Sequence, residues 1–410
     1  MKSRFSSEFF SNNRLRLREL FTGTAPIVLT ANGLMQRSGD VTYAYSQDAS
    51  FWYLTGIDQP DMVLVIDKDR EYLIIPSKSA VQETFDGKLD KKNLSNISGI
   101  KDIREQDDGW EQLKKRLKKV KHVATLAIPP AYLEHYGMYV NPARAALTNR
   151  LHEIKPDIEL LDLSTHLTRM RMIKQLPEIE TIQDAIDCTS ATLKEVLKPT
   201  KLKKYKYEYE IEAAITAGFR KRGSEGHGFQ PIVTGGPRSV TIHNLSNNSA
   251  LAKDELIIID VGAEVNHYSA DISRTISLNK PSKRQKAVID AVGEIQLLAI
   301  DMLKPGVFLK DYESKVEQIM GEKLRSLGLI KTISTEQVRK FYPHATSHFI
   351  GLNVHDIGDY DRPIEPGVIL AVEPGIYISA EGIGVRIEDN ILITPKGNKI
   401  LSRSLPQFIS

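Results

Sequence analysis

Five residues in the C-terminal half of the chain have the types and spacing of a metal site. Four are carboxylates that end an apolar run or lie inside one, and the fifth is a histidine in a segment where three histidines fall within twelve residues. In chain order they are Asp260, Asp271, His348, Glu373 and Glu388. A buried carboxylate is costly unless it is paired or bound to a metal, and four around one point would repel each other. Divalent cations resolve that conflict, so the pattern predicts a two-metal site.

Buried strands are expected to bring these carboxylates together. The apolar run over 255–260 ends in Asp260, and antiparallel pairing with the segment over 270–276 would place Asp271 on the same patch. A second run, over 367–373, delivers Glu373 in the same way.

The segment over 384–391 is predicted to be a strand. Its period of two puts Val385 and Ile387 on one face, and Arg386, Glu388 and Asn390 on the other. Glu388 would therefore share its face with an arginine that can pair with the carboxylates.

A family resemblance rests on these residues and their surroundings. Thr-Ser-His348-Phe-Ile-Gly-Leu-Asn-Val-His355-Asp-Ile-Gly, with the order of the five residues, resembles the aminopeptidase P (Xaa-Pro aminopeptidase) group of the dimetal peptidases with the pita-bread fold. Phe51-Trp-Tyr-Leu-Thr-Gly56 is similar to the N-terminal domain of that group. The resemblance covers nearly the whole chain, and a single such carboxylate would more simply be a surface or salt-bridge residue.

The resemblance implies a division of labour among the metal ligands. Asp271 and Glu388 would bridge two metals, Asp260 would bind one of them, and His348 and Glu373 the other. A bridging hydroxide would attack the peptide carbonyl, and Glu373 would carry a proton towards the leaving proline nitrogen. Oxygen-rich ligation with one histidine favours a harder ion over zinc, and we expect Mn²⁺, although cobalt or iron would also fit this coordination.

Four further residues receive roles from the same resemblance. His243 and His355 would contact the substrate and take part in catalysis, His355 by stabilising the oxyanion and placing the proline. His344 would line the substrate pocket. Arg386 would orient the metal ligands without binding metal itself.

The expected fold class is α+β, with two domains. Residues 1–165 read as a smaller α/β domain, which by resemblance caps the active site and mediates assembly into a homo-oligomer, dimer or tetramer. Residues 166–410 show two successive rounds of helix, helix, then strands with two carboxylates. This order fits the pseudo-twofold pita-bread catalytic domain, in which helices back a curved antiparallel sheet.

Bulk composition excludes several classes of function. Hydrophobic residues make up 41% and charged residues 26%, ordinary values for a globular protein, and no apolar run is long enough to span a bilayer. A net charge of +3 is too small to indicate nucleic-acid binding. The single cysteine, Cys188, precludes an intramolecular disulfide, and the first twenty residues lack the apolar core of a secretory signal. We therefore expect a cytoplasmic protein.

The leading hypothesis is a metal-dependent aminopeptidase that hydrolyses the N-terminal Xaa-Pro bond of peptides. Proline lacks an amide hydrogen and restricts its neighbour, so this bond calls for a dedicated pocket. The nearest alternative is a prolidase, which cuts Xaa-Pro dipeptides only. A methionine aminopeptidase would leave the large N-terminal domain unexplained, and a creatinase-like amidinohydrolase or a metal-free peptide-binding module would not need the complete ligand set.

Overall fold

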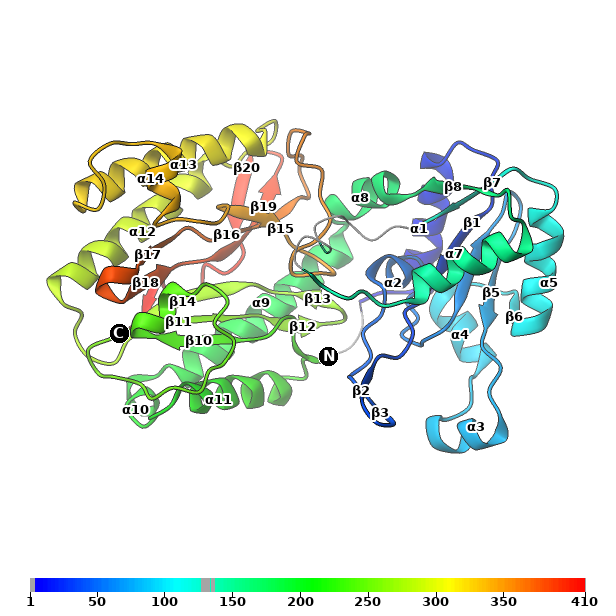
Figure 1. The fold of residues 1–410 in the computed structure, drawn as a ribbon, viewed down its shortest axis with the longest axis horizontal. Helices are drawn as coiled ribbons and strands as arrows, with labels where there is room; N and C mark the ends of the chain where they lie inside the picture. The colour runs from blue at the N-terminus through cyan, green and yellow to red at the C-terminus, as the bar shows by residue number, and fades with distance from the viewer. Residues whose placement is uncertain (1–3, 127–132, 134–136, 410) are drawn as a thin grey trace. The chain divides into compact units, whose positions relative to one another are not determined.

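The computed structural model describes residues 4–126, 133 and 137–409. The chain forms two compact units, with the boundary between Met170 and Arg171. We call residues up to Met170 the N-terminal unit and those from Arg171 the catalytic unit. Each is described by itself, and Figure 1 labels the helices and strands of both.

The N-terminal unit is built on a six-stranded mixed sheet in the order β6-β5-β4-β1-β7-β8. Apolar runs of the sequence form its central strands, and β4 and β5 are almost wholly buried. The apolar run over 123–128 forms β7 as far as Thr125, and Ala127 and Ile128 lie outside the described residues. The strands are β1 (Ile27–Thr30), β4 (Val63–Ile66), β5 (Glu71–Ile75), β6 (Ile103–Glu105), β7 (His122–Thr125) and β8 (Glu159–Asp162), with a separate hairpin of β2 (Gln36–Ser38) and β3 (Val41–Thr42).

Helices surround this sheet and complete its core. The first helix buries Phe9, Phe10 and Leu17, and its fully buried Arg14 pairs with Glu71 on β5 at 2.8 Å. The beginning of the described chain is thus part of the folded unit. The helices are α1 (Ser7–Leu20), α2 (Ala49–Thr55), α3 (Ala80–Asp86), α4 (Lys91–Ser98), α5 (Gln106–Leu117), α7 (Ala143–Ile154) and α8 (Ser164–Met172), the last of which crosses the boundary.

The first half of the catalytic unit pairs two helices with a four-stranded sheet. Pro177 lies in the first turn of the long helix α9, where its missing amide hydrogen costs nothing. The sheet order is β10-β11-β14-β21, with smaller strands β13-β12-β9 beside it. The elements are α9 (Leu176–Val196), α10 (Pro199–Leu202), α11 (Glu208–Lys221), β9 (Gly226–His227), β10 (Ile232–Gly235), β11 (Leu256–Val261), β12 (Ala263–Val265), β13 (Tyr268–Ser269), β14 (Ile272–Ser277) and β21 (Phe408–Ile409), with the 3-10 turn η1 (Gly236–Val240).

The second half repeats this plan. Two helices precede a four-stranded sheet in the order β15-β16-β19-β20 and a two-stranded pair β17-β18. The elements are α12 (Lys283–Met302), α13 (Leu309–Ser326), α14 (Thr335–Arg339), β15 (Ser347–Phe349), β16 (Ile369–Val372), β17 (Gly375–Ile378), β18 (Ile383–Arg386), β19 (Asp389–Thr394) and β20 (Gly397–Ile400), with the 3-10 turn η2 (Ser379–Glu381).

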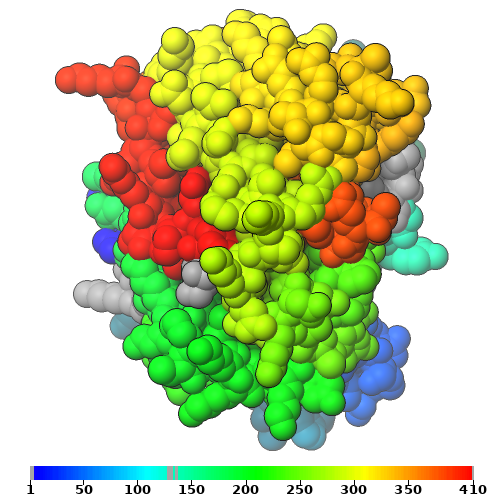
Figure 2. Space-filling model, turned by 90° about the vertical axis from the view of Figure 1, so that its left-hand side faces the viewer, coloured from blue at the N-terminus to red at the C-terminus, as the bar shows by residue number. Residues whose placement is uncertain are grey.

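The two halves share one core. In Figure 1 the strands of the catalytic unit lie between α9 and α11 on one side and α12 and α13 on the other. Figure 2 shows the start of α12, yellow-green, between green residues of the first half and orange-to-red residues of the second. There Arg284 pairs with Glu381 at 2.7 Å. The repeated helix–helix–sheet order and the enclosed strands confirm the α+β pita-bread prediction. Among the described residues, no helix combines the length and apolarity needed to cross a bilayer.

Candidate metal centre

Strand pairing in the first half brings Asp260 and Asp271 together. Strands β11 and β14 are antiparallel, with Asp260 opposite Ser273 and Val261 opposite Ile272. Asp271 precedes β14 and lies diagonally across from Asp260, on the same face of the pair. Both residues are buried, with 8% and 5% of their surface exposed. The predicted antiparallel delivery of two aspartates is confirmed.

The second half supplies two glutamates by different routes. Glu373 follows the buried strand β16, as predicted. The single strand predicted over 384–391 is wrong: β18 ends at Arg386, β19 begins at Asp389, and Ile387 and Glu388 lie between them. The chain changes sheets there, because β18 pairs with β17 whereas β19 pairs with β16.

This break in the strand fixes Glu388 against the first half. The Glu388 amide donates to the carbonyl of Ser273 at 3.1 Å, and the Ser273 hydroxyl donates to Glu388 Oε2 at 2.9 Å. Only 1% of Glu388 is exposed. Glu388 is therefore held at the seam between the two halves.

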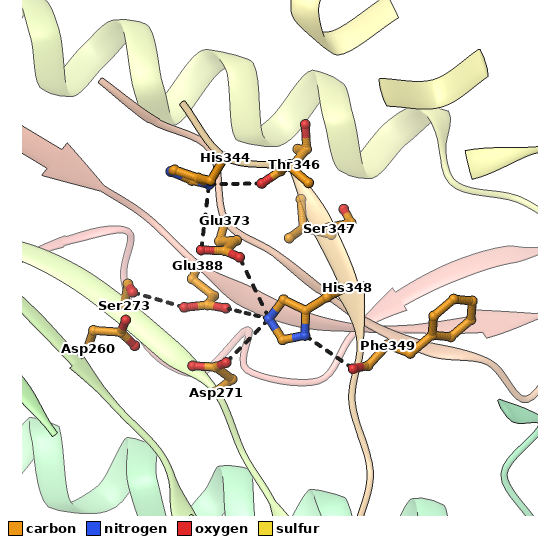
Figure 3. A network of polar contacts seen from close by, with 12 residues as sticks. Asp260, Asp271, Ser273, His344, Thr346, Ser347, His348, Phe349, Glu373 and Glu388 are labelled. Atoms are coloured by element: carbon orange, nitrogen blue, oxygen red, sulfur yellow. Dashed lines mark hydrogen bonds and ion pairs between the residues drawn. The ribbon is translucent and has the colours of Figure 1, made fainter. Parts of the chain in front are cut away.

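His348 on β15 points its ring into this group of carboxylates (Figure 3). Its Nε2 lies 3.4 Å from Asp271 Oδ2, 3.7 Å from Glu373 Oε1 and 3.8 Å from Glu388 Oε1. Its Nδ1 lies 3.1 Å from the carbonyl oxygen of Phe349. Because a carbonyl can only accept, Nδ1 carries the hydrogen and Nε2 presents a lone pair to the carboxylates.

Three buried carboxylate oxygens have no hydrogen-bond partner within the described part of the chain. They are Asp260 Oδ1, Asp271 Oδ1 and Glu388 Oε1. Such atoms are rare in folded proteins, because an unpaired buried polar atom loses its hydration without compensation. All three belong to the residues predicted to bind metal.

Mutual repulsion and burial disturb the protonation of this group. Burial, then Asp260 and Glu373, raise the pKa of Asp271 well above its ordinary value. Burial, then Asp271 and Glu373, do the same to the pKa of Glu388. Burial raises the pKa of Glu373 to about 7, although His348 and Arg386 oppose the shift. The protein alone therefore does not accommodate these negative charges.

A divalent cation fits this arrangement. Asp271, His348 and Glu388 offer one ligand atom each, and these atoms lie within 4.8 Å of one another. Ligand atoms about 2.1 Å from one ion are roughly 3–4 Å apart, which matches the contacts of His348 Nε2. A positive ion would also satisfy the three unpaired oxygens and remove the cause of the raised pKa values.

Arg386 ties the predicted ligands to each other. It is buried, and its guanidinium donates to Asp260 Oδ2 at 2.6 Å, to the Ser273 hydroxyl at 3.0 Å and to the Tyr377 hydroxyl at 2.9 Å. Because Ser273 in turn donates to Glu388, one arginine holds ligands from both halves. This arrangement agrees with the orienting role expected for Arg386.

His344 lies at the edge of the same network. Its Nδ1 is 2.9 Å from the carbonyl of Ala345 and 3.9 Å from Glu373 Oε2, and its Nε2 is 2.9 Å from the Tyr377 hydroxyl. Nδ1 therefore donates to the carbonyl and Nε2 accepts from Tyr377. Burial and the charge of Arg386 lower the pKa of His344 to about 3, so its imidazole is neutral at physiological pH.

His355 lies on the open side of the site. Its ring centroid is 4.3 Å from that of His348, with the rings tilted at 66°. Part of His355 is accessible to solvent, yet the surrounding protein removes enough hydration, with His348 adding repulsion, to lower its pKa to about 4. A neutral imidazole that is both accessible and close to the ligands suits contact with a substrate.

His243 follows the turn η1 and is exposed. His243 makes a small contribution to the lowered pKa of both His344 and His355, so it lies in their neighbourhood. The structure thus gathers all the predicted site residues in one region of the catalytic unit, with His243 at its periphery.

Some residues of this region were not predicted. Ser273 could have been found by extending the β11–β14 pairing, since it lies opposite Asp260. No sequence signal marks Tyr377, or Glu313 on α13, whose carboxylate accepts from the amides of Thr346 and Ser347 at 2.9 and 3.0 Å. Glu313 thereby fixes the start of the strand that carries His348.

Comparison with known proteins places this geometry in a family. The sequence pattern of "Metallopeptidase family M24" matches residues 180–395, and that of "Aminopeptidase P, N-terminal domain" matches residues 10–125. The Xaa-Pro aminopeptidase of Haemophilus influenzae is 30% identical over 434 aligned residues, covering 100% of this chain and 97% of that protein. The human Xaa-Pro aminopeptidase 3 is 29% identical, covering 93% of this chain and 78% of the relative.

Solved structures agree. A putative aminopeptidase P from Bacillus anthracis superposes with a TM-score of 0.89 at 29% identity, covering 98% of this chain and 96% of that one. Zinc-substituted Escherichia coli aminopeptidase P in complex with product gives a TM-score of 0.88 at 26% identity, covering 99% and 97%. The chain therefore belongs to metallopeptidase family M24, is a hydrolase, and carries the N-terminal domain characteristic of aminopeptidase P.

Proposed function

We propose that this protein is an Xaa-Pro aminopeptidase that removes the N-terminal residue from peptides with proline in second position. The observation that carries the proposal is the gathering of three carboxylates, those of Asp271, Glu373 and Glu388, around Nε2 of His348. The names of the relatives described above support the choice of substrate.

We propose two divalent ions at this centre. Asp260, Asp271, His348, Glu373 and Glu388 would hold them. Carboxylate oxygens and a single imidazole favour a hard ion, and Mn²⁺ is our choice. When bound, such a pair supplies an activated water and a Lewis acid for the scissile carbonyl.

The residues of the chain would then divide the remaining work. Glu373 Oε2 would accept a proton from the attacking water and return it to the proline nitrogen as the amide bond breaks. Hydrolysis adds the elements of water: the released residue gains a carboxylate and the proline gains an N–H.

The histidines would hold the substrate. His355 and His243, both accessible, would donate to the carbonyl oxygen and to the proline end of the peptide, and His344 would line the pocket. Arg386 would keep Asp260 and, through Ser273, Glu388 in place during turnover.

The test is to incubate manganese-loaded protein with the tripeptide Ala-Pro-Ala and the dipeptide Ala-Pro, and to follow both by mass spectrometry. Release of alanine from the tripeptide supports the proposal. Cleavage of the dipeptide alone would establish a prolidase, and cleavage of neither by protein with bound metal would overturn both assignments.

We further propose that the N-terminal unit mediates assembly into a dimer or tetramer. Light scattering on the intact protein measures this, and a monomer at micromolar concentration would refute it. The cytoplasmic location and the capping role of this unit stay predictions.

A further inference from the structure

A second cluster of buried ionisable side chains lies in the catalytic unit, apart from the metal ligands. We call it the ion cluster; it comprises Arg171, Lys174, Glu178 and Asp356. Side-chain exposure is 3% for Arg171, 0% for Lys174 and 1% for Asp356, and Glu178 is equally buried. Arg171 donates to Asp356 Oδ1, and Lys174 Nζ lies 3.2 Å from Asp356 Oδ2. Nothing in the metal centre requires these residues as ligands.

Within the ion cluster, Arg171 and Lys174 compensate the charge of Asp356, whereas burial raises the pKa of Glu178 to about 7 although Lys174 opposes the shift. Burial alone would raise the pKa of Asp356, but Arg171 and Lys174 outweigh it, so that the pKa lies below its ordinary value. Buried ion pairs contribute little net stability compared with apolar packing, because both charges lose their hydration. A buried ion pair whose charges are both satisfied does, however, hold the backbone segments that carry the two side chains in a fixed geometry.

The group attached to Asp356 is the segment that carries His355. We call residues 349–356 the histidine loop. Its ends are closed by a hydrogen bond from the Asp356 amide to the Phe349 carbonyl at 2.8 Å. Asp356 directly follows His355 in the chain. The ion pairs of the Asp356 carboxylate therefore restrain the backbone on the C-terminal side of His355.

A glycine brings the backbone of the loop onto the ion pair. A Cβ at Gly351 would lie 2.3 Å from Asp356 Oδ2 and 2.9 Å from Lys174 Nζ, which no real side chain could tolerate without displacement. The Gly351 carbonyl also accepts from the Ser269 amide on β13 at 3.0 Å. The loop is thus seated on the ion cluster at Gly351 and Asp356.

The same cluster reaches the strand that leads to the metal ligands. The Tyr268 hydroxyl donates to Glu178 Oε1 at 2.9 Å. Tyr268 and Ser269 form β13, which leads to Asp271. One buried ionic cluster therefore contacts both the histidine loop and the strand that leads to a predicted ligand.

We infer that Asp356, held by Arg171 and Lys174, is a positioning residue for catalysis that sets the place of His355 relative to His348. The inference rests on the proposed function, because it assigns His355 to the substrate. It adds three residues that touch neither substrate nor metal and act through the histidine loop.

The test is a double-mutant cycle between Asp356→Asn and His355→Ala, with kcat and KM measured on Ala-Pro-Ala. A misplacement of about 1 Å costs on the order of 10²-fold in rate, so Asp356→Asn should lower kcat by up to that factor. In the His355→Ala background the same change should lower kcat less than about 3-fold, because the histidine that it positions is gone. Equal losses in the two backgrounds would overturn the inference.

Two further readouts separate positioning from general damage. Bound metal, measured by elemental analysis, should be unchanged in Asp356→Asn, while amide hydrogen exchange in residues 349–356 should accelerate. The matched control is Glu71→Gln, which removes the partner of the buried Arg14 in the N-terminal unit and should leave kcat unchanged. Unaltered exchange in the histidine loop would contradict the inference.

Should Asp356→Asn fail to fold, the cycle is run with Lys174→Met, which leaves the Arg171–Asp356 pair in place. Failure of the proposed function shows differently, since the wild-type protein itself would then release no alanine from the tripeptide. Normal turnover by the wild type with additive losses in the cycle would refute the positioning role alone.

Discussion

The catalytic unit contains two buried ionic groups with opposite electrostatics. Around His348, four carboxylates gather, three of their oxygens have no hydrogen-bond partner among the described residues, and the pKa values of Asp271 and Glu388 are raised. In the ion cluster Arg171 and Lys174 both pair with Asp356, whose pKa is lowered, while burial raises the pKa of Glu178 to about 7. A buried carboxylate that lacks a countercharge is ready to bind a cation, whereas one already paired with two cations, as Asp356 is, can only hold its own structure.

The largest effect should come from removing a charge that the cation requires. Glu388→Gln keeps size and shape but replaces a ligand oxygen, and several kcal/mol of transition-state stabilisation should be lost with the metal. We expect kcat/KM on Ala-Pro-Ala to fall by roughly 10³-fold or more, together with bound metal in elemental analysis. The control Glu381→Gln, a half-exposed partner of Arg284, should change neither.

Substitutions in the ion cluster and in the metal centre should have opposite effects on the free energy of unfolding of the metal-free protein. Asp356→Asn leaves two buried cations without their partner and should cost about 3–5 kcal/mol in the free energy of unfolding. Glu388→Gln removes repulsion and should raise that free energy. Urea unfolding of metal-free protein at pH 8 measures both, and a loss of stability in Glu388→Gln would contradict the account of the metal centre.

The pH dependence of metal stabilisation tests the raised pKa values. Glu373, with a pKa of about 7 against an ordinary 4.5, binds its proton more tightly when folded. Its contribution to the stability of metal-free protein is complete below pH 4.5 and is lost as the pH rises through 7. Asp271 and Glu388 shift in the same direction and add to this loss.

Bound cations replace those protons, so the loss should vanish in the metal-loaded protein. The difference in Tm between loaded and chelator-treated protein should therefore widen by several degrees from pH 5 to pH 8. Differential scanning calorimetry checks this, and a gap that narrows with pH would show that the carboxylates are not the metal site.

The smallest expected effect concerns the contacts that orient ligands. Ser273→Ala removes the hydroxyl that links Arg386 to Glu388, and loss of such support weakens metal binding by about 10-fold, at most 100-fold. Isothermal titration with Mn²⁺ measures the affinity. Ser277→Ala on the same strand, whose hydroxyl bonds to the Asn279 carbonyl instead, is the matched control and should bind as the wild type does.

Sequence reasoning reached the metal centre because its ligands end apolar runs. Asp260 lies in the last two residues of the buried strand β11, and Glu373 directly follows the buried strand β16. Apolar runs of this kind identify strands whatever their pairing partners are. The alternation over 384–391 was wrongly extended through Ile387 and Glu388, since the change of sheet depends on which strands β18 and β19 pair with. Pairing partners far away along the chain leave no local pattern.

The ion cluster was beyond sequence reasoning for the same reason. Arg171 and Asp356 are 185 positions apart, and Lys174 and Asp356 182. A lone lysine or aspartate is most simply a surface residue, so nothing in its neighbours indicates burial. Helix α9, in contrast, depends on residues within one segment, and both its course and its first-turn proline follow from the sequence.

The change of sheet at Ile387–Glu388 has a consequence for folding kinetics. Arg386 bonds to Asp260 across 126 positions, and Ser273 bonds to Glu388 across 115. Contacts between residues so far apart in sequence form late in folding. The entropy cost of closing the long intervening chain comes before the stabilisation that the contacts provide. The cation site is therefore completed near the end of folding, so metal ions should accelerate refolding little while slowing the loss of the native state considerably.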